Sequence, residues 1–282
     1  MTKKTIKECF YNSPYKSIKH KSYFATYENL FSRFIGKEIV FVEVGVLNGG
    51  SLFMWREYFG NQARIVGIDN NPEAMRWKEH GFEIYIGDQS DINFWKSIVS
   101  KLGKIDILLD DGGHLDYQQS VTLFENINNI KDNGLIVIED THSSYMEEFG
   151  NPSEYSFMKV VFNLIDKLNY RATHLKKNNS FLKLPISDIH IFESIVCFKI
   201  NHENSNVSEE IINNGKDLNV KDFRHNDTER KELNKNIKKI SFIKKIPLIG
   251  PLFNFIYVSI LREKIYSFFL KKNKKRNMKK FF

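Results

Sequence analysis

Two short segments of the sequence concentrate carboxylates and histidines. Residues 109–114 have the sequence Leu-Asp-Asp-Gly-Gly-His, and residues 138–142 have the sequence Ile-Glu-Asp-Thr-His. If Asp111, Glu139 and Asp140 meet in one place, their carboxylates repel one another unless a cation neutralises them. Hard divalent ions such as Mg²⁺ favour carboxylate oxygens and keep coordination positions open for a substrate. The sequence therefore predicts these three residues as the ligands of Mg²⁺ or another divalent cation.

His114 is the predicted catalytic residue. It follows Asp111 by three positions across a Gly-Gly turn, so its imidazole can reach a metal-bound hydroxyl group and remove the proton. The alternative interpretation is purely structural. In that case Asp110 and Asp111 form a turn, and His114 and His142 are surface residues.

A glycine-rich turn, residues 42–51, has the sequence Val-Glu-Val-Gly-Val-Leu-Asn-Gly-Gly-Ser. Glycine permits a tight turn and close approach to a ligand, and a following helix offers free N–H groups. The turn lacks the G-x-G-x-x-G pattern that binds a dinucleotide pyrophosphate. An acid such as Glu43 at the end of the first strand is typical of methyltransferases and suits the positively charged S-adenosylmethionine. We therefore predict Glu43, Gly45, Gly49 and Ser51 as cofactor-binding residues, the alternative being that the glycines only shape the loop.

Further polar residues stand at the ends of later apolar runs. Asp69 can accept hydrogen bonds from both hydroxyls of a ribose. Asp88 can accept one from an adenine amino group, and the predicted cofactor site also includes its neighbour Gln89 and Asp110. Each residue taken alone is as compatible with a helix cap or a turn, but their repetition at successive strand ends favours a binding site.

Five apolar runs must position these residues, and segments with helical spacing separate them. The runs are residues 39–45, 64–69, 82–88, 104–110 and 134–140. Strands buried on both faces are apolar throughout, and alternation with helices indicates parallel pairing. The sequence therefore predicts an α/β fold with a Rossmann-like, doubly wound, mostly parallel sheet, whose ligands bind at the carboxyl ends of the strands.

The remaining elements are predicted from spacing and capping residues. Helices are expected within residues 51–60, 91–103, 117–134 and 156–168, and late strands at residues 172–177, 180–185 and 188–200. Asp91 and Gly103 are the expected start and stop signals of the second helix. Residues 1–38 are predicted to form a cap or lid over a cofactor-binding core at 39–200. A polar linker at 201–240 and a basic, amphipathic, partly helical extension at 241–282 are predicted to follow.

The positive charge of the chain is confined to its end. The net charge is +8, but residues 235–282 contain 14 Lys and Arg against one acidic residue, whereas the rest holds 28 basic and 33 acidic residues. Basic and aromatic residues alternate over 241–282, which suits the surface of an anionic membrane. Packing against the protein or a partner subunit, and binding of nucleic acid, are the alternatives.

The sequence shows no signal peptide and no uninterrupted apolar stretch that could span a membrane. The two cysteines, Cys9 and Cys197, match no zinc spacing and favour a reducing compartment. We therefore expect a cytoplasmic protein, peripheral at the inner face of the membrane if the extension binds there. A homo-oligomer is compatible with the sequence.

Four motifs resemble those of the metal-dependent sugar O-methyltransferases, which include enzymes that methylate macrolide deoxysugars and relatives from bacterial surface-polysaccharide clusters. The motifs are VEVGVLNGGSL, VGIDNNP, DDGGH and VIEDTHSSY, and the resemblance covers residues 15–200. It implies a class I methyltransferase fold, Mg²⁺ held by Asp111, Glu139 and Asp140, and His114 as the base. It also places Tyr23 near the cofactor. The macrolide enzymes carry an additional N-terminal domain with no counterpart here, so their oligomeric state does not transfer.

The expected function is transfer of a methyl group from S-adenosylmethionine to a sugar hydroxyl of a surface polysaccharide, such as the O-antigen of lipopolysaccharide or a capsule. A nucleotide-sugar or a small-molecule glycoside is the alternative acceptor. The missing G-x-G-x-x-G argues against an NAD-dependent oxidoreductase. An acidic core, and the absence of an Asn/Asp-Pro-Pro-aromatic motif, argue against a nucleic-acid methyltransferase. A non-catalytic membrane protein would need a damaged site, which the sequence does not indicate.

Overall fold

The computed structural model describes residues 4–172, 184–203, 210–216 and 218, together with residues 268, 271, 275, 278 and 279. They belong to two compact units, residues 1–211 and 212–282, and all the helices and strands named below lie in the first unit. In the second unit, residues 268, 271, 275 and 278 have helical backbone. The predicted linker at 201–240 and extension at 241–282 otherwise fall almost entirely outside the described residues.

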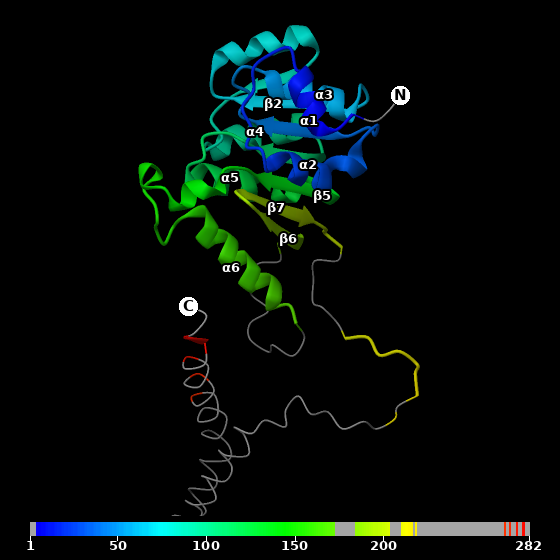
Figure 1. The fold of residues 1–282 in the computed structure, drawn as a ribbon, viewed down its shortest axis with the longest axis vertical. Helices are drawn as coiled ribbons and strands as arrows, with labels where there is room; N and C mark the ends of the chain where they lie inside the picture. The colour runs from blue at the N-terminus through cyan, green and yellow to red at the C-terminus, as the bar shows by residue number, and fades with distance from the viewer. Residues whose placement is uncertain are drawn as a thin grey trace, which may run out of the picture. The chain divides into compact units, whose positions relative to one another are not determined.

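A seven-stranded sheet with the order β3-β2-β1-β4-β5-β7-β6 organises the first unit (Figure 1). The strands are β1 (Val40–Val44), β2 (Arg64–Asp69), β3 (Glu83–Ile86), β4 (Ile105–Asp110), β5 (Ile130–Ile138), β6 (Ile186–Phe192) and β7 (Ile195–Ile200). Strands β1 to β5 pair in parallel, and β7 is antiparallel to both of its neighbours. The predicted doubly wound, mostly parallel sheet is therefore confirmed. The strand order reverses between β1 and β4, the point at which such sheets bind ligands.

Helices cover both faces of the sheet and create two hydrophobic cores. The α-helices are α1 (Ile6–Asn12), α2 (Tyr23–Phe31), α3 (Gly50–Phe59), α4 (Ile92–Leu102), α5 (Asp116–Asn126) and α6 (Phe157–Asn169). The 3₁₀ segments are η1 (Ser32–Phe34), η2 (Pro72–His80), η3 (Ile127–Asn129), η4 (Thr141–Tyr145) and η5 (Glu147–Phe149). Successive strand residues point to opposite faces. Phe41 therefore belongs to the core that includes residues of α1, α2 and α3, whereas Val42 belongs to the core that includes residues of α4, α5 and α6.

The amino-terminal elements are part of the first core. Ile6 of α1 and Tyr27 and Phe31 of α2 are completely buried there. The segment between α1 and α2 lines the pocket described below through Lys16, Ser17 and Ile18. Apolar packing of α1 and α2 therefore positions this segment.

The late part of the chain differs from the prediction. Residues 188–200, expected to form one strand, belong to an antiparallel hairpin in which Phe192 of β6 pairs with Ile195 of β7. Ser194 makes the turn with a φ of 59°, although it is not a glycine. The turn therefore lacks the Asn-Gly or Asp-Gly signal that marks a hairpin in a sequence. The strands predicted at 172–177 and 180–185 lie largely outside the described residues.

Helix α5 ends earlier than predicted, and β5 begins earlier. Residues 130–134, assigned from the sequence to a helix that ends at 134, form the first part of β5. Pairing with β4 is irregular there, and Asn133 has a φ of 64°. The polar residues Lys131, Asp132 and Asn133 lie at this irregular pairing and interrupt the apolar run. A search for apolar runs therefore does not find the start of the strand. Asp91 and Gly103 cap α4 as predicted.

Candidate cofactor and metal site

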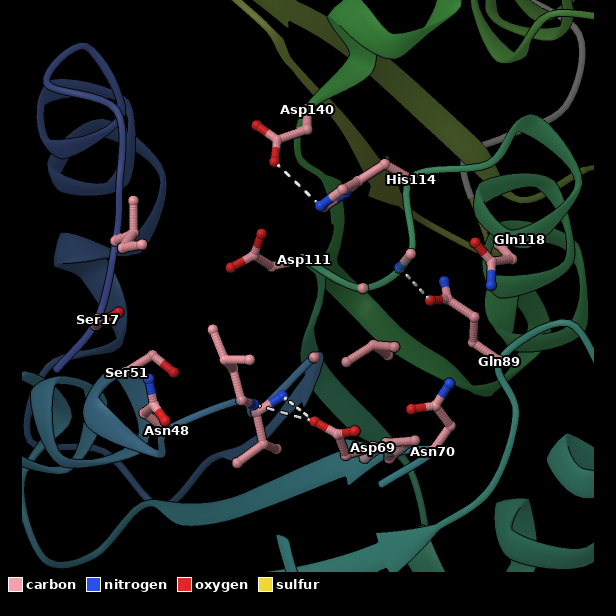
Figure 2. Close-up of a pocket in the computed structure, with 18 of the residues that line it drawn as sticks. Ser17, Asn48, Ser51, Asp69, Asn70, Gln89, Asp111, His114, Gln118 and Asp140 are labelled. Atoms are coloured by element: carbon pink, nitrogen blue, oxygen red, sulfur yellow. Dashed lines mark hydrogen bonds and ion pairs between the residues drawn. The ribbon is translucent and has the colours of Figure 1, made fainter. Parts of the chain in front are cut away.

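A pocket of about 400 Å³ lies at the carboxyl ends of β1 to β5 (Figure 2). Eight of the predicted site residues line it: Gly45, Ser51, Asp69, Asp88, Gln89, Asp111, His114 and Asp140. The other five lie beside it without lining it: Tyr23, Glu43, Gly49, Asp110 and Glu139. Lys16, Ser17 and Ile18 close one side, and Figure 2 shows Ser17 across the pocket from Gln89.

The glycines of the first turn allow two loops to touch. Gly45 has a φ of 90°, and a Cβ placed on it would lie 2.0 Å from the carbonyl oxygen of Asp111. Gly49 precedes α3 with a φ of 73°, and a Cβ there would lie 2.3 Å from the ring of Trp77. Both positions need glycine because of protein contacts, so the interpretation that these glycines shape the loop accounts for them. Gly45 also lines the pocket.

Glu43 is buried and serves to attach α3 to the end of β1. It accepts a hydrogen bond of 2.8 Å from the Ser51 hydroxyl and one of 3.0 Å from the Trp55 indole N–H. Burial raises the pKa of Glu43 to about 7. Ser51 reaches the pocket wall, whereas Glu43 lies behind it.

Asp69 organises the turn that follows β1. Its Oδ2 accepts hydrogen bonds from the backbone N–H groups of Val46 at 2.9 Å and Leu47 at 3.0 Å, and its Oδ1 accepts one from Asn71 N–H at 2.8 Å. An ionised carboxylate offers about four acceptor positions. Three amides therefore leave room for a hydroxyl group from a ligand, on the pocket side where Figure 2 shows Asp69.

Gln89 and Asp110 lock the loops after β3 and β4 together. The Gln89 side-chain N–H₂ lies 3.0 Å from each carboxylate oxygen of Asp110, and its carbonyl oxygen accepts a 2.8 Å hydrogen bond from Gly113 N–H. Burial raises the pKa of Asp110. Asp88 is exposed at the pocket rim, where it accepts hydrogen bonds from the backbone and hydroxyl of Ser90. Asp110 thus has a structural contact, and Asp88 is the more accessible acceptor.

Asp111, His114 and Asp140 form a donor set for a cation. One ligand atom from each lies within 4.8 Å of the others, and His114 Nε2 is 3.3 Å from Asp140 Oδ2. His114 and Asp140 both have left-handed backbone, with φ of 58° and 52°. Non-glycine residues adopt this conformation infrequently, and such residues cluster at functional sites. Two carboxylates and an imidazole at this spacing fit a divalent cation.

Glu139, the third predicted metal ligand, has other partners. Its carboxylate is fully buried and accepts a 2.5 Å hydrogen bond from the Tyr27 hydroxyl and a 2.9 Å hydrogen bond from the Lys19 ammonium group. Burial raises the pKa of Glu139, and the Lys19 ammonium group beside it acts in the opposite direction. Asp111 and Glu139 therefore meet at Lys19, and Asp111 and Asp140 meet at His114.

Lys19 also belongs to this site, although it is not among the residues predicted from the sequence. It is one of 42 Lys and Arg residues, and nothing in its neighbourhood marks it as different. Tyr23 was expected near the cofactor, but its hydroxyl donates a hydrogen bond to Asp140 Oδ1. His20 and His142 also approach this carboxylate, each at 3.9 Å. Within the described residues, Asp140 and these histidines make a second possible donor set.

The sequence is similar to several antibiotic-sugar methyltransferases, although no protein-family model matches it. It is 33% identical over 138 residues to the 8-demethyl-8-alpha-L-rhamnosyl tetracenomycin-C 2'-O-methyltransferase of Streptomyces olivaceus, a match covering 45% of this chain and 35% of that protein. It is 27% identical over 187 residues to the mycinamicin VI 2''-O-methyltransferase of Micromonospora griseorubida, covering 60% and 45%. The predicted resemblance to sugar O-methyltransferases is confirmed. The matches span less than half the length of these curated relatives.

The structure comparison supports the fold. MycE methyltransferase from the mycinamycin biosynthetic pathway, solved in complex with Mg and SAH, superposes with a TM-score of 0.65 at 21% identity, over 76% of this chain and 58% of MycE. This likeness shows that the chain has the class I methyltransferase fold. None of the helices in the described part of the chain is both long and apolar enough to cross a membrane.

Proposed function

We propose that this chain is an S-adenosylmethionine- and divalent-metal-dependent O-methyltransferase whose acceptor is a sugar hydroxyl of a small-molecule glycoside. The observation that carries the proposal is the cation donor set of Asp111, His114 and Asp140 inside a pocket at the switch point of a methyltransferase fold. Curated relatives are named as methyltransferases of rhamnosyl tetracenomycin and mycinamicin, which favours a glycoside over the surface polysaccharide expected from the sequence.

The pocket residues suit the cofactor. Asp69 has acceptor capacity for ribose hydroxyls, and Asp88 at the rim can accept a hydrogen bond from an adenine amino group. The turn after β1 is held by the hydrogen bonds to Asp69 and by the close contact of Gly45 with Asp111, so protein contacts alone support the proposed cofactor wall. Preorganised contacts of this kind reduce the entropy cost of binding.

The residues of the donor set would act on the acceptor. Asp111 and Asp140 would hold the cation, while His114 would take the proton of the sugar hydroxyl. The carboxylate of Asp140, 3.3 Å from His114 Nε2, would stabilise the imidazolium that results. When bound, the divalent ion lowers the pKa of a hydroxyl group beside it, and S-adenosylmethionine supplies the methyl group. The protein's remaining contribution is to align oxygen, carbon and sulfur.

The test is an in vitro assay of the full-length protein with S-adenosylmethionine, Mg²⁺ and three acceptor classes. We expect a rhamnosyl or deoxysugar glycoside to gain one methyl group by mass spectrometry, and EDTA to abolish the gain until Mg²⁺ is restored. If only the lipopolysaccharide or capsule fragment is methylated, the acceptor is a polysaccharide and not a small-molecule glycoside. Methylation of a nucleotide-sugar alone would place the step before glycosyl transfer. Full activity in EDTA would disprove the metal requirement and leave the methyltransferase assignment standing.

A further inference from the structure

A lysine from the amino-terminal segment is inserted between two of the predicted metal ligands. Lys19 Nζ lies 2.5 Å from Asp111 Oδ2 and 2.9 Å from Glu139 Oε2. The Lys19 side chain is only 1% exposed, and Glu139 is fully buried. The ammonium group therefore supplies positive charge to both carboxylates.

The ammonium takes the space that an ion bound by both residues would need. A magnesium ion lies about 2.0–2.1 Å from each carboxylate oxygen that it binds. An ion that engages Asp111 Oδ2 and Glu139 Oε2 would therefore occupy the position of Lys19 Nζ. An ion held only by Asp111, His114 and Asp140 would not, because Lys19 has no contact with His114 or Asp140 among the interactions found in the described residues.

The segment around Lys19 is anchored at its two ends and open between them. Ser13 donates a 2.7 Å hydrogen bond to the carbonyl of Gly50, and the Tyr15 ring packs 4.6 Å from that of Trp77. At the other end the chain enters α2, whose Tyr23 is buried. Ile18 is 73% exposed, and His20 is exposed as well. Moving Lys19 outward therefore requires a short exposed stretch to move and leaves both anchors in place.

The charge balance favours an exchange. Asp111 and Glu139 share one ammonium group, so a divalent cation that replaces it neutralises more of their charge. The ammonium group and a divalent cation cannot both lie between Asp111 Oδ2 and Glu139 Oε2, because two positive charges repel each other strongly in a buried site.

We propose that Lys19 is a tethered cation that occupies the metal site in the metal-free protein, and that a divalent ion engaging Glu139 displaces it. The inference rests on the proposed metal-dependent function and adds the residue that competes with the metal. It also accounts for Glu139, which lies outside the donor set of Asp111, His114 and Asp140 while Lys19 is in place.

The first test measures metal affinity in the full-length protein without cofactor or acceptor. Mn²⁺ binding is followed by electron paramagnetic resonance for the wild type, for Lys19→Met and for Lys21→Met, an exposed lysine of the same segment. Lys19→Met should bind Mn²⁺ about tenfold more tightly or better, since a competing positive charge has been removed. Lys21→Met should stay close to wild type. Equal affinity of Lys19→Met and wild type would overturn the inference.

The second test needs no variant, so it does not depend on how Lys19→Met folds. Amine acetylation followed by peptide mass spectrometry reports the accessibility of each lysine in the wild type. Lys19 should be protected without metal and should become reactive with saturating Mg²⁺ or Mn²⁺, whereas exposed Lys21 should react equally in both states. Protection of Lys19 in the metal-bound protein would overturn displacement, yet would leave the cation site of Asp111, His114 and Asp140 intact. Absence of metal binding in wild type and Lys19→Met alike would overturn this inference together with the metal part of the proposed function.

Discussion

Asp140 is the residue on which the polar contacts of the site converge. Its carboxylate accepts a hydrogen bond from Tyr23 and has three histidines within 3.9 Å. Its left-handed backbone, with a φ of 52°, turns the side chain toward the pocket at the end of β5. A residue with so many partners is suited to couple a cation, a base and the amino-terminal segment.

His114 can act as a base or as a metal ligand, and one variant separates the roles. His114→Ala should lower the methyl-transfer rate by roughly 10²–10⁴, as for other general bases, while the affinities for S-adenosylmethionine and Mn²⁺ remain near wild type. Calorimetric titration of both ligands is the measurement. Loss of Mn²⁺ binding in a folded variant would instead make His114 a ligand, and the base would have to be another group.

The raised pKa of Glu43 predicts that the free energy of unfolding depends on pH. Burial raises its pKa from 4.5 to about 7, so between these pH values the native protein keeps a proton that the unfolded chain has lost. The free energy of unfolding of the wild type should therefore fall as the pH rises through this window. The Gln side chain of Glu43→Gln does not titrate. The stability of this variant relative to wild type should therefore increase by up to about 3 kcal/mol as the pH rises from 4.5 to 8.

Urea unfolding at several pH values checks this expectation. Glu83→Gln is the matched control, because the ion pair with Arg64 lowers the pKa of Glu83. Its removal should cost stability at neutral pH and less as the pH falls, which is the opposite sign. Parallel pH profiles for Glu43→Gln and wild type would show that folding does not raise the pKa of Glu43.

At the scale of elements, the site depends on how loops at neighbouring strand ends approach one another. The turn after β1 touches the loop after β4 at Gly45, and Gln89 joins the loop after β3 to Asp110. The strands themselves supply the parallel frame, but these loop contacts set the pocket's shape. Their close fit makes the first turn sensitive to a single added methyl group.

Gly45→Ala tests this contact against a matched glycine. Both Gly45 and Gly60 have positive φ, of 90° and 92°, but a Cβ at Gly60 would have nothing within 4 Å. Gly60→Ala should therefore show only the backbone strain, on the order of 1–3 kcal/mol, and should keep cofactor binding. Gly45→Ala should lose more stability and should also lose S-adenosylmethionine affinity, as measured by thermal unfolding and calorimetry. If the two variants lose the same stability and keep the same S-adenosylmethionine affinity, the contact between the turn after β1 and the loop after β4 does not determine cofactor binding.

At the scale of the whole molecule, the strands that frame the pocket and the basic end are separate in sequence. All five parallel strands and the predicted metal residues lie before residue 141, whereas the net positive charge lies in residues 235–282. We propose that residues 241–282 bind an anionic membrane surface, since each Lys or Arg near such a surface contributes about 1 kcal/mol. A glycoside acceptor does not require this contact, so the two proposals stand independently.

Deletion of residues 241–282 should abolish binding to anionic vesicles and leave cofactor affinity unchanged. Vesicle sedimentation at low salt, with neutral vesicles as the control, is the measurement. If the full-length protein does not sediment with anionic vesicles, the membrane-binding proposal is wrong. An insoluble truncated protein, or one without cofactor affinity, would show that the segment is a packing element of the fold or of an oligomer.

The sequence by itself determined the frame and most of the pocket. Apolar runs between helical segments predicted β1 to β4 closely, because strands buried on both faces must be apolar along their whole length. Parallel pairing then placed the strand ends on one edge, so Asp69, Asp111 and Asp140 were predicted to share a pocket, and they line it. These inferences succeed because they depend on side-chain periodicity and burial, which each short stretch of sequence records.

Only the tertiary structure decided which polar groups meet. Lys19 is 92 residues from Asp111 and 120 from Glu139, and no local pattern records such a contact. The same holds for Gln89, whose amide reaches Asp110 across 21 residues, and for Ser194, which turns the β6–β7 hairpin without a glycine. The packing of α1 and α2 on the sheet brings Lys19 to the two carboxylates, since apolar burial fixes the chain path and a buried ammonium must then find its counter-charges.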